Sequence, residues 1–295
     1  MTSPGSAQSP PEEPALRIDL HTHSSASDGT TPPGSLVREA AAAGLDVVAL
    51  TDHDTTDGWA AAAEALPGGL RLVRGAELSC TRGGISLHLL AYLFDPDVEP
   101  LASRLRDLCE SRVRRAERMV DLLVADGVPV SWEQVRGLAA GTVGRPHIAQ
   151  ALVQSGLIGS IADAFTPTWI GTYGRYWGGK LELDAVEAVG LVTEAGGVCV
   201  FAHPSAASRG RTVGDAVIEE LAAAGLAGLE VDHPDHPPEA RAHLTLLAAD
   251  LGLLATGASD FHGSNKSTAL GANLTPVGVY DDLVSRATGA EVLQG

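Results

Sequence analysis

The chain of 295 residues lacks any hydrophobic run close to the roughly 20 residues that a membrane-spanning helix needs. It has only three cysteines, at positions 80, 109 and 199, and no CxxC spacing, so a reducing cytoplasm is the expected location. The opening residues, MTSPGSAQSPPEEP, carry neither the charged segment nor the apolar segment of a signal peptide. Their proline and serine content predicts a disordered tail over residues 1–14.

Basic residues are also scarce. Lysine and arginine number 20 against 37 acidic residues, which gives a formal net charge of −17. A surface this acidic repels nucleic acid at long range, so an anionic substrate needs a local positive centre. Bound cations would provide one, although most of the acidic surface is explained by solubility alone.

Hydrophobic residues make up 44% of the chain, enough for a sizeable core, and they form short β-rich runs that alternate with helical stretches. Alternation of this kind is typical of a parallel sheet or barrel, so the fold class is α/β. The predicted strands cover residues 16–20, 46–51, 70–77, 85–94, 197–202, 228–231 and 253–256. The predicted helices cover residues 33–43, 57–66, 184–195, 213–224 and 238–251.

The middle of the chain breaks this rhythm. Residues 99–180 show helical patterns and no convincing strand, which predicts a helical insertion that caps the substrate, between barrel segments 15–98 and 181–285. The long stretch ASRLRDLCESRVRRAERMVDLLVADG is rich in arginine. Interspersed glutamates favour a solvated helix face with intrahelical ion pairs, with one or two arginines directed into the cleft as the alternative.

Histidines and carboxylates follow the predicted strands. In DLHTHSSASDG, at residues 19–29, the i, i+2 spacing of His21 and His23 on extended chain directs both rings to one side. The carboxyl ends of barrel strands meet at one mouth, where active sites are built. So many titratable side chains at one mouth would suffer from burial and from repulsion between like charges, and bound cations would remove that conflict. Imidazole together with carboxylate suits Mn, Zn or Fe. The expected metal ligands are His21, His23, Asp28, His53, Glu77, His88, His203, Asp260 and His262.

Seven motifs along the chain, in order, resemble those of the PHP (polymerase and histidinol phosphatase) domain. They are DLHTHSSASDG, ALTDHDT, GAELS, HLLAY, AHP, LEVDHPDH and ASDFHG, and the match spans about residues 16–264. Within the family the chain most resembles the branch of 3′,5′-nucleotide bisphosphate phosphatases and 5′–3′ exoribonucleases. That branch carries a helical insertion with a GRPH motif, which is found here at residues 144–147.

The resemblance implies a distorted seven-stranded (β/α) TIM-like barrel, which agrees with the strand and helix pattern. It also implies two to three divalent ions. By position, the first ion would be held by His21, His23, Glu77 and Asp260. Glu77 would bridge to a second, and the remaining ligands are His88 and His203 for the second ion and Asp28, His53 and His262 for the third.

The resemblance also implies a site for a second phosphate beside the one that is cleaved, because the family branch uses GRPH for that purpose. Arg145 and His147 would sit at a helix N-terminus, where free N–H groups favour an anion. An ordinary helix cap with a surface arginine is the alternative. Lys180 and Arg175 are further candidates for substrate binding. The neighbouring aromatic residues Trp169, Tyr173 and Tyr176 either stack on a base or pack the insertion onto the barrel.

Three departures from the family pattern are visible. Ala258 replaces a glycine of GGSDFHG, Asp232 follows LEV where an aromatic residue is common, and TPTWIGTYGRYWGGK replaces a stretch similar to YLGRGGPAYV. The last two lie on the expected substrate side and leave the exact substrate open.

The expected chemistry needs no covalent nucleophile, because paired metal ions lower the pKa of a shared water and the metal-bound water can attack. Ser79, Cys80 and Ser259 lie near the motifs without a nucleophile–base arrangement, so packing behind the ligands is favoured. The leaving group would be protonated by a metal-bound water or by His233 or His236, the nearest spare histidines.

We therefore expect a cytoplasmic, metal-dependent phosphoesterase that hydrolyses a phosphate monoester of a small nucleotide bearing two phosphates, such as a 3′,5′-bisphosphate. The alternatives are a 5′–3′ exonuclease on short RNA, which the acidic charge disfavours, and a phosphatase for a biosynthetic intermediate similar to histidinol phosphate. A non-catalytic metal-binding module is the remaining alternative, and the nine filled ligand positions argue against it. No obligate protein partner is indicated.

Overall fold

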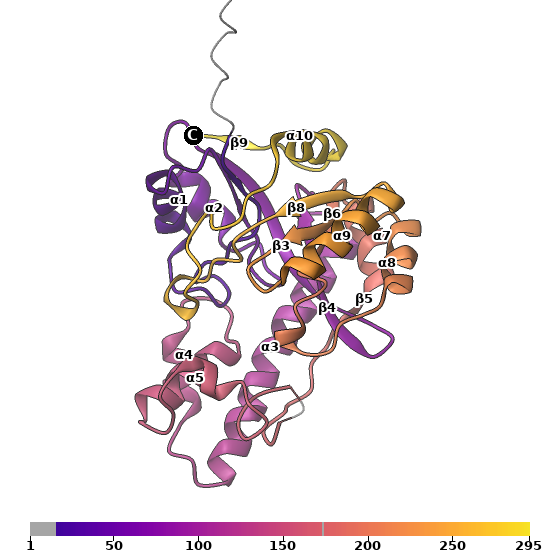
Figure 1. Cartoon of the computed structure of the whole chain (residues 1–295). Coiled ribbons are helices and arrows are strands. Elements are labelled where there is room, and N and C mark those ends of the chain that lie inside the picture. The colour runs from indigo at the N-terminus through magenta and orange to yellow at the C-terminus, as the bar shows by residue number, and fades with distance from the viewer. Residues whose placement is uncertain (1–15, 173) are drawn as a thin grey trace, which may run out of the picture.

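The computed structural model describes residues 16–172 and 174–295, so the predicted tail and Tyr173 lie outside the described residues. Seven strands follow one another around a nearly closed barrel, in the order β1-β2-β3-β4-β6-β7-β8, and β5 and β9 pair with β3. Figure 1 shows the barrel in the upper part of the view. The two ends of this path meet at a bridge between Thr22 and Phe261. The strands are β1 (Ile18–Asp19), β2 (Val47–Leu50), β3 (Arg71–Arg82), β4 (Ile85–Tyr92), β5 (Leu183–Asp184), β6 (Val198–Ala202), β7 (Gly228–Asp232), β8 (Leu254–Gly257) and β9 (Leu293–Gln294).

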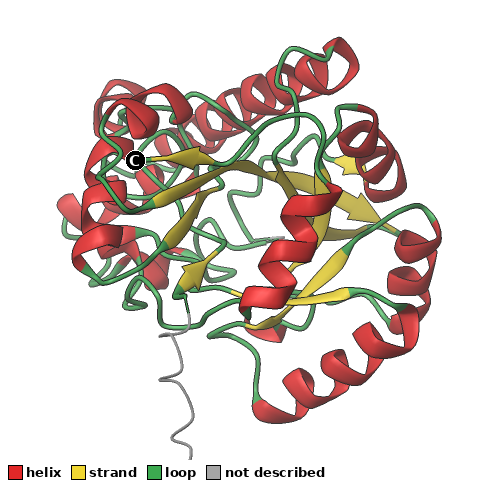
Figure 2. Ribbon diagram, turned by 90° about the horizontal axis from the view of Figure 1, so that it is seen from above, coloured by secondary structure: helices red, strands yellow, loops and turns green. Residues whose placement is uncertain are grey.

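Helices surround the strands, as the view down the barrel shows (Figure 2). The predicted alternation of strands and helices is confirmed, and helix α9 has the predicted bounds. The helices outside the insertion are α1 (Pro33–Ala42), α2 (Trp59–Glu64), α7 (Ala185–Glu194), α8 (Asp215–Ala223), α9 (Pro238–Leu251) and α10 (Val277–Arg286), and the short 3₁₀ helices are η1 (Ala207–Arg209) and η2 (Gly263–Asn265). The sequence patterns missed α10 and β9.

The strand VVAL shows why the sequence pattern was continuous rather than alternating. Val47 and Ala49 pack in one hydrophobic cluster, which includes Ile18, while Val48 and Leu50 pack in another, which contains Leu36 of α1. A parallel strand covered on both faces must be apolar at every position. Each fully buried valine or leucine contributes roughly 1.5–3 kcal/mol, so this packing holds in place the strand that precedes His53.

Strand β4 departs from the parallel pattern that the alternation predicted. It pairs antiparallel with both β3 and β6. The reason lies in Gly83 and Gly84, which form a two-residue turn with φ of 57° and 73° between the paired residues Arg82 and Ile85. Two consecutive positive φ angles are those of a type I′ hairpin, which glycine adopts without strain. The barrel is therefore distorted by one reversed strand.

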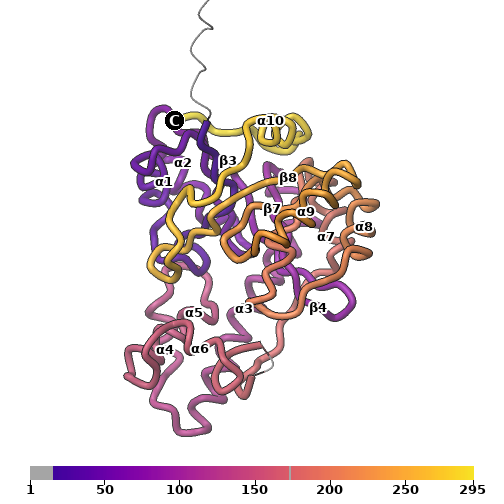
Figure 3. Tube along the Cα trace, viewed as in Figure 1, coloured from indigo at the N-terminus to yellow at the C-terminus, as the bar shows by residue number. Residues whose placement is uncertain are grey.

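The described residues between 99 and 180 form four helices and no strand. They are α3 (Glu99–Ala125), α4 (Trp132–Leu138), α5 (Arg145–Gln154) and α6 (Ile161–Ala164). Helix α3 runs from the barrel into this region, where α4, α5 and α6 lie together at one end of the molecule (Figure 3). These helices share a hydrophobic cluster of their own, which includes Met119, Val135, Ile148 and Ala164. None of the helices in the described part of the chain has the length and apolar character that crossing a bilayer requires.

Candidate metal centre

Most of the predicted ligands lie just beyond strand ends. His21 and His23 follow β1, His53 follows β2, and His203 follows β6 directly. Asp28 lies in the turn beyond β1, and Asp260 and His262 lie beyond β8. Glu77, which we expected at the end of its strand, lies within β3, because that strand continues into the hairpin. His88 lies within β4.

Glu77 is the centre of the cluster. Its Oε2 lies 3.2 Å from His21 Nε2, 3.0 Å from His23 Nε2 and 3.1 Å from His53 Nδ1. Its Oε1 lies 2.7 Å from His88 Nδ1 and 2.9 Å from His203 Nε2. One buried carboxylate thus faces five imidazoles, three on one oxygen and two on the other, as a bridging ligand would.

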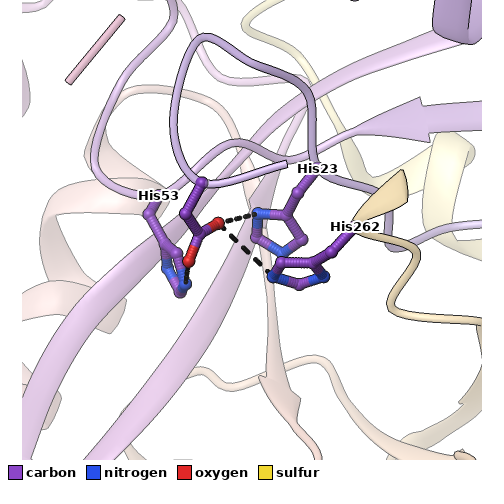
Figure 4. Close-up of side chains that lie close together, drawn as sticks. His23, His53 and His262 are labelled. Atoms are coloured by element: carbon purple, nitrogen blue, oxygen red, sulfur yellow. Dashed lines mark ion pairs between the residues drawn. The ribbon is translucent and has the colours of Figure 1, made fainter. Parts of the chain in front are cut away.

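Asp28 and Asp260 bring the remaining histidine into the cluster. Asp28 Oδ1 lies 3.6 Å from His23 Nδ1 and 3.3 Å from His262 Nε2, and its Oδ2 lies 3.6 Å from His53 Nε2. Figure 4 shows the rings of His23, His53 and His262 turned toward one carboxylate. The Oδ1 atom of Asp260 lies 3.4 Å from His23 Nε2 and 3.4 Å from His262 Nδ1.

The donor set fits divalent cations. Eight of the nine predicted residues fall into three groups whose ligand atoms lie within 4.8 Å of one another: His23, Asp28, His53 and His262; His21, His23 and Asp260; and His53, Glu77 and His88. The ninth, His203, reaches Glu77 as described. Several of these buried atoms make no hydrogen bond of good geometry in spite of their close neighbours, namely Nδ1 of His23, His53 and His88 and Oδ1 of Asp260. Buried polar atoms without partners are rare in folded proteins, and bound cations would satisfy them.

The electrostatics place some ligands in the protonation state that metal binding requires, while His21 and His23 would release protons. Burial would lower the pKa of these two rings, but the surrounding carboxylates raise both, that of His23 to about 9. Burial would raise the pKa of Glu77, but His53, His88 and His21 hold it well below its ordinary value, so the carboxylate is ionised. Burial and the nearby Arg209 lower the pKa of His203 to about 3, so this imidazole is neutral at pH 7. Ionised carboxylates and neutral imidazoles are the forms that ligate metals.

Four buried carboxylates behind the ligands were missed as functional residues, although each lies within or beside a quoted motif. Glu230 Oε1 lies 3.0 Å from His21 Nδ1, and its Oε2 accepts the backbone N–H of His203 at 2.7 Å. Asp19 Oδ1 accepts the backbone N–H of Ser259 at 3.0 Å. These contacts tie the ligand loops after β1, β6 and β8 to the barrel.

Asp52 and Asp54 flank His53, and their hydrogen bonds connect the segment after β2 to the loop after β1 and to β3. Asp52 accepts hydrogen bonds from the backbone N–H of Ser24 at 2.8 Å and from its hydroxyl at 2.6 Å. Asp54, whose φ is 58°, accepts hydrogen bonds from the backbone N–H of Ser79 at 2.7 Å and from Nε of Arg112 at 2.5 Å. Backbone in the left-handed region is strained for a non-glycine residue, and it persists here because these contacts hold it.

The two histidines predicted as proton donors are engaged elsewhere. His233 Nδ1 accepts the backbone N–H of Asp235 at 3.0 Å, so its Nε2 carries the proton and lies 3.3 Å from Asp260 Oδ2. His236 Nε2 accepts the backbone N–H of Ser205 at 3.2 Å, so its Nδ1 donates to the carbonyl of Val231 at 3.0 Å. Both rings are buried, and the structure brings neither to the cavity described next.

A cavity of about 510 Å³ opens onto the ligands. His53, His88 and His203 line it together with Arg145 and Lys180, two of the four predicted substrate-binding residues. It is also lined by Arg112 and Arg115 of α3, which agrees with the alternative that one or two arginines of this stretch are directed into the cleft. The other lining residues that the sequence did not single out include Phe165, Trp177, Arg209 and Lys266.

The other two predicted substrate-binding residues lie outside this cavity lining. His147 is buried, and its Nδ1 accepts the backbone N–H of Gly144 at 3.0 Å. Arg175 pairs with Asp126 at 2.7 Å. The aromatic rings of Trp169 and Tyr176 lie 6.2 Å apart and pack in the hydrophobic cluster of the insertion itself, so the contact with the barrel that one alternative expected is not what they make there.

Comparisons with known proteins agree with the geometry. Residues 19–119 match the model of the PHP domain. The chain is 35% identical to the 3′,5′-nucleoside bisphosphate phosphatase of Chromobacterium violaceum, over 83% of this chain and 87% of the relative. It is 32% identical to a 5′–3′ exoribonuclease of Haemophilus influenzae, over 88% of this chain and 94% of the relative.

A solved structure from Bifidobacterium adolescentis, described as a metal-dependent phosphoesterase, superposes with a TM-score of 0.88 at 38% identity. The superposition covers 94% of this chain and 98% of that one. The motifs, the barrel and the ligand cluster lead to the same conclusion as these relatives: the chain belongs to the PHP domain family.

Proposed function

We propose that this protein is a metal-dependent phosphoesterase that releases phosphate from a small nucleotide bearing two phosphate groups, such as a 3′,5′-bisphosphate. One observation carries the proposal: the same cavity joins the ligand cluster to two arginines, Arg115, which is buried, and Arg145, which is partly buried. Among the described residues, no carboxylate pairs with Arg115 or Arg145. The relative from Chromobacterium violaceum is named for activity on such bisphosphates.

The two arginines form an anion site that a second phosphate would fill. Arg115 is 4% exposed, and its Nε has no hydrogen-bond partner. Burial and the neighbouring Arg145 and Arg112 lower the pKa of Arg115 to about 9, and burial and Arg112 lower that of Arg145 to about 10. Both remain cations at neutral pH, so two poorly solvated positive charges lie near each other, and no carboxylate in the described part of the chain forms an ion pair with either. Arginine binds phosphate oxygens through its planar fork. An anion bound here would offset the repulsion between the two guanidinium groups and the cost of their burial.

Aromatic rings hold Arg145 in place. Its guanidinium carbon lies 5.2 Å from the centre of the Phe165 ring and 5.8 Å from that of Trp177. Stacking of this kind fixes the plane of the guanidinium before the substrate arrives. Lys180, which pairs with Glu182 at 2.7 Å, adds a further cation to the same cavity.

We propose two to three divalent ions of Mn, Zn or Fe, held by the nine residues described above. Such ions supply positive charge for the phosphoryl oxygens and lower the pKa of water. Neither Ser79 nor Cys80 is set up as a nucleophile: the Ser79 hydroxyl donates to Asp54 and accepts from Arg112, while burial raises the pKa of the Cys80 thiol well above its ordinary value. We also propose a cytoplasmic location, supported by three free cysteines.

The test measures phosphate release from 3′,5′-bisphosphates, nucleoside monophosphates, a simple aryl phosphate and short 5′-phosphorylated RNAs. Stripped protein is reloaded with each metal separately. We expect Arg145→Ala and Arg115→Met to raise KM for the bisphosphate about 10- to 100-fold, because each removes a charge-assisted hydrogen bond. The aryl phosphate, which has no second phosphate, is expected to react unchanged.

Arg114→Ala is the matched control, because Arg114 lies on the same helix but is exposed and pairs with Glu110. If Arg145→Ala and Arg115→Met lower activity on the aryl phosphate as much as on the bisphosphate, the two arginines do not bind a second phosphate. Preferred release of mononucleotides from RNA would favour the exoribonuclease activity for which the relative from Haemophilus influenzae is named.

A further inference from the structure

Asp260 divides its two oxygens between opposite environments. Its Oδ1 faces the imidazoles of the ligand cluster, as described. Its Oδ2 lies 2.5 Å from Arg209 Nη2 and 2.6 Å from Lys266 Nζ. Two cations therefore lie within hydrogen-bond distance of one oxygen of a metal-ligand candidate, and none of the sequence motifs pointed to either of them.

The charges of this arrangement do not balance once Asp260 binds a cation. Arg209 also donates from Nε to Asp235 at 2.7 Å, which neutralises one positive charge. Lys266 has no acidic partner other than Asp260 among the described residues. A carboxylate that shares its charge with a divalent ion no longer neutralises a lysine fully, so excess positive charge remains beside the metal ligands.

Both cations have donors left for a ligand. The contacts described for Arg209 use Nε and Nη2, which leaves the two N–H groups of Nη1, and a lysine ammonium has three donors. The side chains of Arg209 and Lys266 are 32% and 31% exposed, and both line the cavity. They come from the barrel, on the loop with η1 and beside η2, whereas Arg115 and Arg145 come from the insertion.

We propose that Arg209 and Lys266 form an oxyanion site for the phosphoryl group that is cleaved. The site is separate from the Arg115–Arg145 site, which takes the phosphate that stays, and the inference rests on the proposed function. Asp260 determines where this site lies. Arg209 and Lys266 both contact the Asp260 carboxylate, so an oxyanion that reaches them must lie next to the metal ligands. Fixed cations at this position stabilise the charge on the transferring phosphoryl oxygens, as arginine and lysine clamps do in phosphoryl transfer.

The experiment uses metal-loaded full-length protein and the variants Lys266→Met and Arg209→Met, with inorganic phosphate as the probe. Calorimetry is expected to show phosphate binding weakened about 10- to 100-fold in each variant. A competing chelator dye measures metal affinity, which is expected to be unchanged or higher, because removing a cation leaves Asp260 more available to the metal. Lys266→Arg, which keeps the charge, is expected to restore most of the phosphate affinity.

Kinetics separate this site from the other one. Lys266→Met and Arg209→Met are expected to lower kcat by the same factor on the aryl phosphate and on the bisphosphate, whereas Arg145→Ala affects the bisphosphate alone. Arg286→Met, which removes the same charge from exposed α10, is the control for net charge.

Two results would overturn the inference: unchanged phosphate affinity, or metal affinity that falls together with phosphate affinity, which would make the pair a support for Asp260. A third result separates the two proposals. If bisphosphates prove not to be substrates while phosphate binding still weakens in the variants, the proposed function fails and the oxyanion site stands.

Discussion

Glu230 acts on the metal centre through His21. His21 Nδ1 lies 3.0 Å from Glu230 Oε1, and its Nε2 lies 3.2 Å from Glu77 Oε2. A proton kept on Nδ1 by Glu230 would leave Nε2 as the nitrogen that binds a metal. Burial would raise the pKa of Glu230, but His21 and His233 lower it to about 2, so it stays ionised at neutral pH. A carboxylate behind a histidine ligand fixes the tautomer and raises the basicity of the ligand nitrogen.

Glu230→Gln should therefore weaken metal binding. The amide keeps one acceptor oxygen but loses the charge, and it cannot serve both His21 and the backbone N–H of His203. We expect metal affinity to fall about 10- to 100-fold, measured by competition with a fluorescent chelator. Glu219→Gln on exposed α8 is the matched control. Equal metal affinities for the two variants would contradict the role of Glu230.

Helix α5 begins at the GRPH motif, and the structure gives His147 a local role there. Its Nδ1 accepts the backbone N–H of Gly144, one of the groups that a helix N-terminus leaves without a partner. This contact requires a neutral ring. Burial lowers the pKa of His147 below its ordinary 6.5, which agrees with an acceptor nitrogen inside the protein.

The sign of the pH effect follows from that lowered pKa. Because the unfolded chain binds the proton more readily, the stability that His147 contributes is fully present above pH 6.5 and is lost as the pH falls through the folded pKa. At pH 8, we expect His147→Ala to lower the free energy of unfolding by about 0.5–1.5 kcal/mol, measured by urea denaturation. At pH 5 the difference from wild type should shrink. A difference that is constant or larger at pH 5 would rule out the capping role, and His243→Ala, at an exposed histidine, is the control.

Secondary structure was predictable where one local pattern decided it. The run VVAL and the helix from Pro238 were found because burial on both faces and a proline at the helix start leave clear signals. The alternation of strands and helices predicts the wrong direction for β4, because Gly83 and Gly84 form a two-residue turn that reverses the chain without an intervening helix.

At the scale of the molecule, the sequence predicted the proposed metal ligands better than it predicted the residues that line the cavity. Seven of the nine proposed ligands follow strands, and strand ends of a barrel must meet, so the convergence of those seven followed from topology. The contacts of Arg115 with Trp177 and of Arg209 with Asp260 join residues that are 62 and 51 positions apart. Such pairs have no local signal, and an arginine that is buried looks the same in the sequence as one on an exposed helix face.

Removal of the metal should affect the whole barrel, because the ligands come from β1, β2, β3, β4, β6 and β8 and close the ring of strands. A ligand that binds only the folded state at 100 times its Kd stabilises it by about 2.7 kcal/mol. For a chain of this size that corresponds to a rise in Tm of roughly 5–10 °C. We expect chelator-stripped protein to melt lower by this amount in calorimetry and to recover when Mn, Zn or Fe is returned.

The double variant Asp28→Asn with His262→Gln tests whether the shift comes from this centre. Both residues belong to one group of ligands, so the variant keeps the Glu77 contacts but loses an ion. The stripped variant should melt close to stripped wild type, while its gain on metal addition should be smaller. Equal gains for the two proteins would place the stabilising ion elsewhere, and an unchanged Tm for wild type with and without metal would show that the cluster folds without needing cations.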